Sequence, residues 1–263
     1  VLNNIKYPKK NTLYILEISS FQLEFIKHFS PDILVYTNIS PDHLDRHGSM
    51  EEYINMKLNA LINMKDEGQI VYNKDDTILE KVLSPFPHKK QPFSTKSKDV
   101  LYKIENKNII GPSNDKLLNI DELSIPGEHN LQNFLAASTC SHLMGISQNQ
   151  IVKSMKEFKG VEHRLEYVRT INEVEYINDS KATNINSVIV AINTYDQPII
   201  LILGGFNKGA NFRLLLPHIK SSHVRDIVSY GDAGGQINTA LGDAVRSVQV
   251  TDLSSAVKKA QLM

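Results

Sequence analysis

The sequence predicts an α/β protein in two parts. Residues 1–160 should form a mostly parallel sheet with helices and a small antiparallel appendage, and residues 161–263 a doubly wound parallel sheet. Three observations support this. Apolar runs rich in β-branched residues alternate with helical periodicity, as in parallel sheets covered by helices. Residues 92–125 instead alternate short strand-like runs with turn sequences. Gly160 breaks the chain between the two parts.

The first part holds three strand patterns and four helical patterns. Residues 12–18 combine β-branched and aromatic side chains without a breaker, which favours a strand. Ser49 precedes a helical pattern with Glu51 and Glu52 in its first turn, which indicates a helix N-terminus. Gly145 ends a long apolar-rich helical run. The expected strands are 12–18, 33–39 and 69–72, and the expected helices are 49–65, 75–83, 129–144 and 147–158.

The second part alternates strand and helix patterns throughout its length. Such alternation predicts helical crossovers between parallel strands, and therefore a doubly wound sheet. The expected strands are 166–171, 174–178, 198–203, 224–229 and 246–250. The expected helices are 184–194, 211–220, 234–241 and 253–261.

Composition excludes several classes of function. Lys plus Arg equals Asp plus Glu at 29 each, so the chain lacks the basic excess that is typical of nucleic-acid-binding domains. No apolar run reaches membrane-spanning length, so we expect no membrane insertion. The single cysteine, Cys140, cannot form an internal disulfide, which fits a reducing compartment. We therefore expect a cytoplasmic protein without a nucleic-acid partner.

Residues 176–184 are the most informative stretch. An apolar run stops there at Asp179, Ser180, Lys181 and Thr183, before a helical pattern begins. Ligands of open α/β sheets bind outside the carboxyl ends of the strands. A carboxylate, hydroxyls and an ammonium suit phosphates, magnesium and a carboxylate substrate. An ordinary helix-capping turn with polar surface residues explains this run equally well by itself.

Two further polar clusters follow strand patterns in the first part. Glu17 interrupts an apolar run near its carboxyl end. A charge there is costly if buried without a partner, so Glu17 is either a metal ligand or an ordinary surface glutamate. Residues 42–47 are rich in His and Asp, which ligate divalent cations but also form ordinary polar turns. Tyr53 and Lys57 lie four residues apart on one helix face, where a solvated lysine is the ordinary interpretation.

Three more motifs suit anionic ligands. Asn130 and Asn133 stand three residues apart at a helix start, where anions bind, and simple capping explains only one of them. His163 and Arg164 lie at the expected domain junction, and arginine is a natural partner of phosphates. Lys208 follows paired glycines that permit close backbone approach to a ligand, although many α/β loops share this pattern.

The order of these motifs resembles the Mur ligase family. The resemblance rests on Glu-Ile-Ser-Ser-Phe-Gln-Leu-Glu, Asp-His-Leu-Asp-Arg-His, Gly-Glu-His-Asn-Leu-Gln-Asn, Glu-His-Arg-Leu-Glu, Asn-Asp-Ser-Lys-Ala-Thr-Asn and Leu-Gly-Gly-Phe-Asn-Lys-Gly. It covers nearly the whole chain apart from residues 75–125. It implies a partial central ATP-binding domain over residues 1–160, followed by a partial, Rossmann-like C-terminal domain over residues 161–263.

The resemblance implies an ATP-dependent ligase of peptidoglycan precursor synthesis. Such an enzyme adds D-glutamate to UDP-N-acetylmuramoyl-L-alanine through an acyl phosphate, with ATP and Mg²⁺. A monomer in the bacterial cytoplasm is expected. The implied metal ligands are Glu17, His43 and a carbamylated Lys57. The implied catalytic residues are Lys57, His43, Lys181 and Lys208. The implied ATP-binding residues are Asn130, Asn133, His163, Arg164 and Asp179, and the implied substrate-binding residues are Ser19, Tyr53 and Thr183.

The chain also departs from the family pattern. The family's P-loop precedes the Glu17 segment, and no Gly-x-x-x-x-Gly-Lys-Ser/Thr pattern occurs in this sequence. We therefore expect a truncated ligase without turnover of its own. Two alternatives remain open from the sequence. One is a metal-dependent hydrolase using Glu17, Asp42, His43, Asp45 and His47, and the other is a nucleotide-binding module without catalysis.

Overall fold

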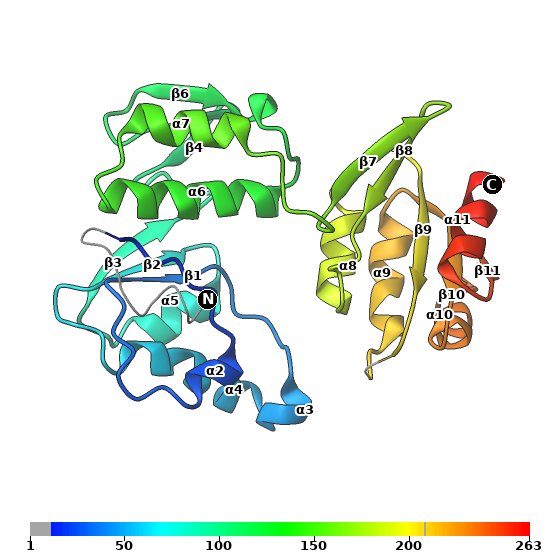
Figure 1. Ribbon diagram of the computed structural model, residues 1–263, viewed down its shortest axis with the longest axis horizontal. Helices are drawn as coiled ribbons and strands as arrows, with labels where there is room; N and C mark the ends of the chain where they lie inside the picture. Colours follow the sequence, from blue (N-terminus) through cyan, green and yellow to red (C-terminus); the bar gives the residue numbers. More distant parts are fainter. Residues whose placement is uncertain (1–11, 208) are drawn as a thin grey trace. The chain divides into compact units, whose positions relative to one another are not determined.

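The computed structural model describes residues 12–207 and 209–263, and it describes Asp45 without its side chain. The chain divides into two compact units, Val1–Lys103 and Ile104–Met263, and Figure 1 follows their elements in sequence order. No helix of the described residues is long and apolar enough to cross a membrane. The predicted boundary near residue 160 stays a prediction, because a division by compactness does not test where the domains of the family meet.

The first unit is built on a parallel sheet of three strands. The order is β1 (Ile33–Tyr36), β2 (Gln69–Asn73) and β3 (Lys89–Phe93). The helices are α2 (Ser20–Leu23), α3 (Leu44–His47), α4 (Met50–Leu58), η1 (Asn59–Leu61) and α5 (Thr77–Leu83). The buried core joins strand residues to residues of α4, η1 and α5: Tyr36, Ile39, Tyr53, Leu61, Met64, Ile70, Tyr72, Leu79 and Leu83.

Helix α4 begins as the sequence predicts and ends earlier. The Ser49 hydroxyl accepts a hydrogen bond from the Glu52 amide at 3.1 Å, which caps the helix. The α-helix ends at Leu58 and continues only as the short η1 segment, so the prediction of one helix to residue 65 was too long. The Asn59 side chain donates to the Leu23 carbonyl at 3.4 Å, a tertiary contact at the point where the helix tightens.

The predicted strand over residues 12–18 was wrong, because the structure has no strand there. Leu13, Tyr14, Ile15 and Leu16 are all exposed. A strand forms only when a neighbouring strand satisfies its backbone N–H and C=O groups. Among the described residues no strand pairs with this segment. The composition of this segment favours a strand, but composition does not reveal whether a neighbouring strand is available to pair with it.

The second unit begins with the predicted small sheet. It contains β4 (Lys103–Glu105), β5 (Asn108–Ile110) and β6 (Lys116–Asn119), with β5 antiparallel to β6, and the short η2 segment (Ile120–Glu122) follows. Residues 92 and 93 belong instead to β3, so the appendage starts later than predicted. Helices α6 (Glu128–Leu143) and α7 (Gln148–Glu157) follow, as expected from their patterns.

The chain then forms a second parallel sheet with helices on both faces. Strands β9 (Ile199–Gly204), β10 (Val224–Tyr230) and β11 (Arg246–Gln249) lie in the order β11-β10-β9. Neighbouring side chains of a strand face opposite sides, and both Ile227 and Val228 are fully buried. Ile227 joins the core formed with α8 (Ile185–Ile192), α9 (Leu216–Ser221) and α10 (Gly234–Leu241). Helix α11 (Leu253–Gln261) contacts β9 and β10, and η3 (Phe212–Leu215) precedes α9.

Strands β7 (Glu166–Ile171) and β8 (Val174–Asn178) do not join that parallel sheet. They form a separate antiparallel pair, visible in Figure 1 as a long hairpin, so their inclusion in the doubly wound sheet was wrong. The connection consists of Asn172 and Glu173, whose φ angles are 49° and 64°. This is the left-handed geometry of a two-residue hairpin turn. A parallel crossover needs a far longer connection.

A buried carboxylate ties β10 to β11. Asp226 is 3% exposed and accepts hydrogen bonds from Arg225 Nε at 2.9 Å and Arg246 Nε at 2.6 Å. Burial alone raises the pKa of Asp226, but the hydrogen bonds from Arg246 and Arg225 outweigh it and hold that pKa below its ordinary value. The ionised form of Asp226 therefore stabilises the folded sheet.

Replacing Asp226 should destabilise the second unit. We expect Asp226→Asn to lower the free energy of unfolding by about 1–3 kcal/mol at neutral pH, because hydrogen bonds to charged groups are lost. Since the folded pKa is depressed, the contribution is complete above the unfolded pKa of about 3.9 and disappears as the pH falls through the folded value. Urea unfolding at neutral and acidic pH measures both effects. The exposed Asp243→Asn is the matched control, and an equal loss in both variants would contradict the assignment.

Candidate functional site

The first group of candidate residues lies around the start of α2. Ser19 precedes this helix and forms a capping box with Gln22, in which the Ser19 amide donates to Gln22 Oε1 at 2.9 Å and the Ser19 hydroxyl accepts from the Gln22 amide at 3.3 Å. These reciprocal bonds satisfy the first amides of the helix. They also fix the segment that carries Ser20 and Phe21.

His47 is the buried centre of this group. Its Nε2 lies 3.0 Å from the Ser20 hydroxyl oxygen, and its ring stacks on Phe21 with centroids 5.3 Å apart and planes 8° apart. Tyr53 of α4 lies at the same centroid distance, 5.3 Å, in a tilted arrangement. One imidazole therefore connects α3 both to the neighbouring helix α4 and to α2, which is distant in sequence. The sequence assigned His47 only to the hydrolase alternative.

His43 and Lys57 flank the same aromatic cluster. The His43 ring lies 4.9 Å from that of Phe21, and Lys57 Nζ lies 5.0 Å from the centre of the Tyr53 ring. The main chain of Lys57 is anchored as well, because the Tyr36 hydroxyl donates to its carbonyl at 2.9 Å. Two of the predicted catalytic residues thus contact different members of one cluster, His43 through Phe21 and Lys57 through the predicted substrate residue Tyr53.

The Asp76 carboxylate anchors the start of the loop that carries His43. The Ile39 amide donates to Asp76 Oδ2 at 2.8 Å, while Asp76 Oδ1 caps α5. His43 itself has a φ of 53°, in the left-handed region that non-glycine residues rarely adopt. Such strain persists only where surrounding contacts over-determine the backbone. Asp42 Oδ2 lies 3.7 Å from His43 Nε2.

The environment of Lys57 lowers the pKa of its amine below the ordinary value. Burial lowers the pKa of Lys57, and the negative charge of Asp42 opposes part of this shift. Burial also raises the pKa of Tyr53, and Asp42 adds to that effect. Asp42 therefore acts electrostatically on both side chains, although the sequence assigned it only to the hydrolase alternative.

The three predicted metal residues differ in their exposure to solvent. Glu17 is exposed and lies in the segment without a strand, while His43 is exposed and Lys57 is half-buried. No group of three or more His, Cys, Asp or Glu side chains within residues 12–207 and 209–263 is arranged to hold a metal ion. Mg²⁺ prefers oxygen ligands, and an ammonium repels it. The donor set fits Mg²⁺ only if Lys57 carries a carbamate, a form that the neutral amine can reach.

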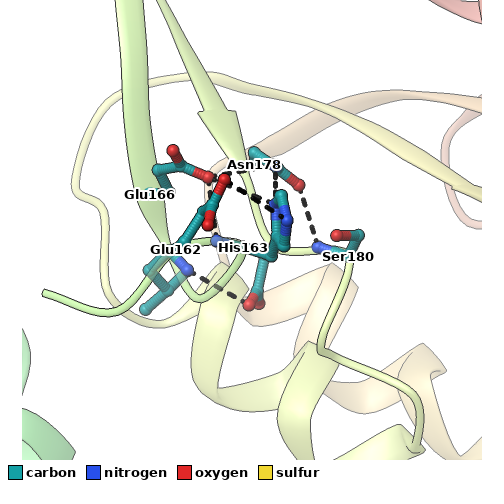
Figure 2. A network of polar contacts seen from close by, with 7 residues as sticks. Glu162, His163, Glu166, Asn178 and Ser180 are labelled. Atoms are coloured by element: carbon teal, nitrogen blue, oxygen red, sulfur yellow. Dashed lines mark hydrogen bonds and ion pairs between the residues drawn. The ribbon is translucent and has the colours of Figure 1, made fainter.

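The second group of candidate residues lies at the open end of the β7–β8 hairpin, opposite its turn (Figure 2). Glu166 Oε2 accepts hydrogen bonds from the His163 amide at 2.8 Å and from Asn178 Nδ2 at 3.1 Å. Asn178 Oδ1 accepts from the Ser180 amide at 3.1 Å. These bonds join the segment before β7 to the segment after β8. Glu166 and Asn178 both stand within motifs of the family resemblance, but the sequence indicated no role for either residue.

Backbone contacts reinforce this junction. The Lys181 amide donates to the His163 carbonyl at 3.1 Å, and the Leu165 amide donates to Asp179 Oδ1 at 3.1 Å. His163 and Leu165 have φ angles of 68° and 44°. Each such left-handed residue costs about 1–3 kcal/mol. The hydrogen bonds at both ends of the segment offset that strain and hold His163 and Arg164 in place.

The remaining candidates of this group differ in their surroundings. Burial raises the pKa of Asp179, while the Leu165 amide and the Arg164 charge lower it less. The side chains of Lys181 and Thr183 are exposed. Lys208 lies outside the described residues.

Asn130 and Asn133 lie in the first turns of α6. Asn130 is buried, and its Nδ2 donates to the Pro126 carbonyl at 2.6 Å, which closes the turn that enters the helix. Asn133 is exposed. The two asparagines therefore differ: one amide nitrogen already has a main-chain partner, and the other side chain is open to solvent.

Two family models match the chain. The model of the Mur ligase middle domain matches residues 3–141, and the model of the Mur ligase glutamate ligase domain matches residues 163–263. These matches give no support to a metal-dependent hydrolase built on residues 42–47.

Relatives of the chain carry names that agree with the family models. A UDP-N-acetylmuramoylalanine–D-glutamate ligase of Clostridioides difficile (strain 630) is 40% identical, over 98% of this chain and 58% of the relative. The ligase of the same name from Christiangramia forsetii is also 40% identical, over 94% of this chain and 57% of the relative. The chain thus spans less than two thirds of the length of these relatives.

Solved structures share the fold at low identity. A MurF from Acinetobacter baumannii superposes with a TM-score of 0.69 and 15% identity, over 88% of this chain and 53% of that one. The UDP-N-acetylmuramate–alanine ligase MurC of Thermotoga maritima superposes with a TM-score of 0.66 and 19% identity, over 91% of this chain and 55% of that one. A Thermotoga maritima MurF solved in complex with ADP superposes with a TM-score of 0.62 and 15% identity, over 93% of this chain and 64% of that one.

The bond between Ser20 and His47 should couple the stability of two segments. We expect His47→Phe to lower the free energy of unfolding by about 1–3 kcal/mol, because it leaves the buried Ser20 hydroxyl without this partner. The double variant Ser20→Ala/His47→Phe should regain part of that loss, because both partners are then apolar. Urea unfolding of both single variants and the double variant gives the coupling energy. Strictly additive losses would contradict the interaction.

Proposed function

Because the chain belongs to the Mur ligase family, we propose that the protein containing it adds D-glutamate to UDP-N-acetylmuramoyl-L-alanine in an ATP-dependent reaction of peptidoglycan precursor synthesis. The observation that carries the proposal is the gathering of His43 and Lys57 around Phe21 and Tyr53. It occurs in a chain that matches D-glutamate ligases along 98% of its length. The activity is proposed for the whole protein.

The proposed reaction has two steps. The substrate carboxylate attacks the γ-phosphorus of ATP, which forms an acyl phosphate and releases ADP. The amine of D-glutamate then attacks the acyl carbon, and inorganic phosphate leaves as the amide forms. Phosphoryl transfer depends mainly on positioning and on neutralisation of developing charge, rather than on covalent help from the protein. The residues of this chain would supply those two contributions.

The first unit would supply the metal-binding contribution. Glu17, His43 and a carbamylated Lys57 would hold Mg²⁺, which when bound neutralises negative charge on the phosphates. Half-burial of Lys57 and its lowered pKa support the carbamate, because only the neutral amine combines with carbon dioxide. Ser19 and Tyr53 would contact the nucleotide-sugar substrate. Ser19 is held by its capping box and Tyr53 by its contact with His47, so both residues are fixed before substrate arrives.

The second unit would supply the nucleotide-binding contribution. His163, Arg164 and Asp179 would contact ATP, together with Asn130 and Asn133 at the start of α6. Arginine pairs with phosphate through two parallel hydrogen bonds, and a helix N-terminus favours anions. Lys181, Thr183 and Lys208 would hold D-glutamate and the acyl phosphate, since an ammonium beside a carboxylate selects an anionic amino acid. We also propose a monomer located in the bacterial cytoplasm, where these nucleotide substrates are made.

Lys57 offers the sharpest test of the proposal. In the complete protein that contains this chain, we expect Lys57→Met to reduce ligation at least about a hundredfold, because a charge-stabilising group at the reacting phosphate is lost. Formation of ADP that requires both UDP-N-acetylmuramoyl-L-alanine and D-glutamate is the measurement. The exposed Lys65→Met is the matched control and should retain activity. Normal ligation by Lys57→Met, or phosphate release without ATP, would refute the assignment.

A further inference from the structure

The orientation of the Asn178 side chain is fixed by two partners of opposite type (Figure 2). Its Oδ1 lies 3.1 Å from the Ser180 amide nitrogen, and its Nδ2 lies 3.1 Å from Glu166 Oε2. A backbone N–H can only donate, and an ionised carboxylate can only accept. Exchanging the oxygen and nitrogen of the Asn178 amide would set donor against donor and acceptor against acceptor. Nδ2 therefore faces Glu166 and His163.

This orientation determines which nitrogen of the neutral His163 ring carries the proton. His163 Nδ1 lies 2.9 Å from Asn178 Nδ2, and an amide nitrogen only donates. Nδ1 must accept that bond and therefore carries no hydrogen. Glu166 Oε2 is also 3.5 Å from Nδ1, but it already accepts from the His163 amide and from Asn178. The proton of the neutral ring lies on Nε2.

The Nε2 edge of the His163 ring is open to a ligand. The His163 side chain is 48% exposed, and Glu162 Oε1 lies 3.7 Å from Nε2, too far for a hydrogen bond. The main chain of His163 is held at both ends, by Glu166 through its amide and by Lys181 through its carbonyl. The ring is therefore anchored on the Nδ1 side and presents an N–H donor on the Nε2 side.

We propose that Asn178 and Glu166 are positioning residues that fix His163 in the Nε2–H tautomer, so that the ring donates a hydrogen bond to an anionic ligand. The hairpin brings the two positioning residues together, because the β7–β8 register places Glu166 directly opposite Asn178. The identification of the ligand as ATP phosphate rests on the proposed function. The tautomer does not depend on it.

The tautomer can be measured on the chain itself. In ¹⁵N-histidine-labelled protein at mildly alkaline pH, two-bond nitrogen–proton correlations distinguish Nε2–H from Nδ1–H rings. His163→Gln identifies the His163 signal among the 9 histidines. We expect Nε2–H in the unmodified chain. Asn178→Asp places a carboxylate acceptor at Nδ1 and should move the proton to Nδ1. Asn172→Asp in the turn of the same hairpin adds the same charge and should leave the tautomer unchanged.

A second variant and a binding assay separate this inference from the proposed function. Asn178→Ala removes the donor without adding charge and should relax His163 to a mixture of tautomers. In the complete protein that contains this chain, titration with a fluorescent ATP analogue should show about a tenfold or greater loss of affinity in Asn178→Asp, because a hydrogen bond to a charged group is lost. Asn172→Asp should bind as the unmodified complete protein does.

Each outcome is decisive. An Nδ1–H ring in the unmodified chain, or an unchanged tautomer in both Asn178 variants, would overturn the positioning role. A tautomer switch with undiminished affinity for the ATP analogue would overturn the donor role of His163 toward nucleotide, and with it the place of His163 in the proposed function. A switch accompanied by weaker binding supports both.

Discussion

The hydrogen bonds between residues 163–166 and residues 178–181 are the constraint on which the second candidate site depends. The two-residue turn of the β7–β8 hairpin brings the ends of the hairpin together, and a register shift between Tyr167 and Arg169 brings Glu166 opposite Asn178. Without these bonds, His163 and Leu165 would leave their left-handed conformations, which cost free energy. The position of Arg164, between them, depends on the same bonds.

In the first unit, aromatic packing holds the candidate residues in place. His47, Phe21 and Tyr53 form a contiguous stack that carries His43 on one side and Lys57 on the other. A buried imidazole needs a polar partner, and the Ser20 hydroxyl supplies it. In both units, therefore, residues without a proposed role in the reaction, such as His47 and Glu166, contact the proposed functional residues and hold them in place. This arrangement is expected wherever catalysis depends on positioning.

Local signals predicted much of the fold. Ser49 and its following glutamates marked the start of α4, and the apolar runs of β9, β10 and β11 were found within a residue or two. Non-local pairing could not be read from the sequence. Among the described residues no strand pairs with residues 12–18, and the Asn172-Glu173 turn lacks the glycine that usually reveals a tight hairpin turn. The Ser20–His47 contact joins residues 27 positions apart. The roles of the predicted site residues stay predictions, and Lys208 lies outside the described residues.

Amide hydrogen exchange tests most directly whether the hydrogen bonds between residues 163–166 and residues 178–181 hold the open end of the hairpin together. The amides of Leu165 and Lys181 donate to acceptors across the junction, and the His163 amide donates to Glu166 at its edge, although all three amides belong to irregular segments. Exchange at these amides at least about a hundredfold slower than in an unstructured peptide is expected if the ends are locked. Exchange of all three at the rate of an unstructured peptide would contradict the locked junction and remove the basis for placing His163 and Arg164 in a common site.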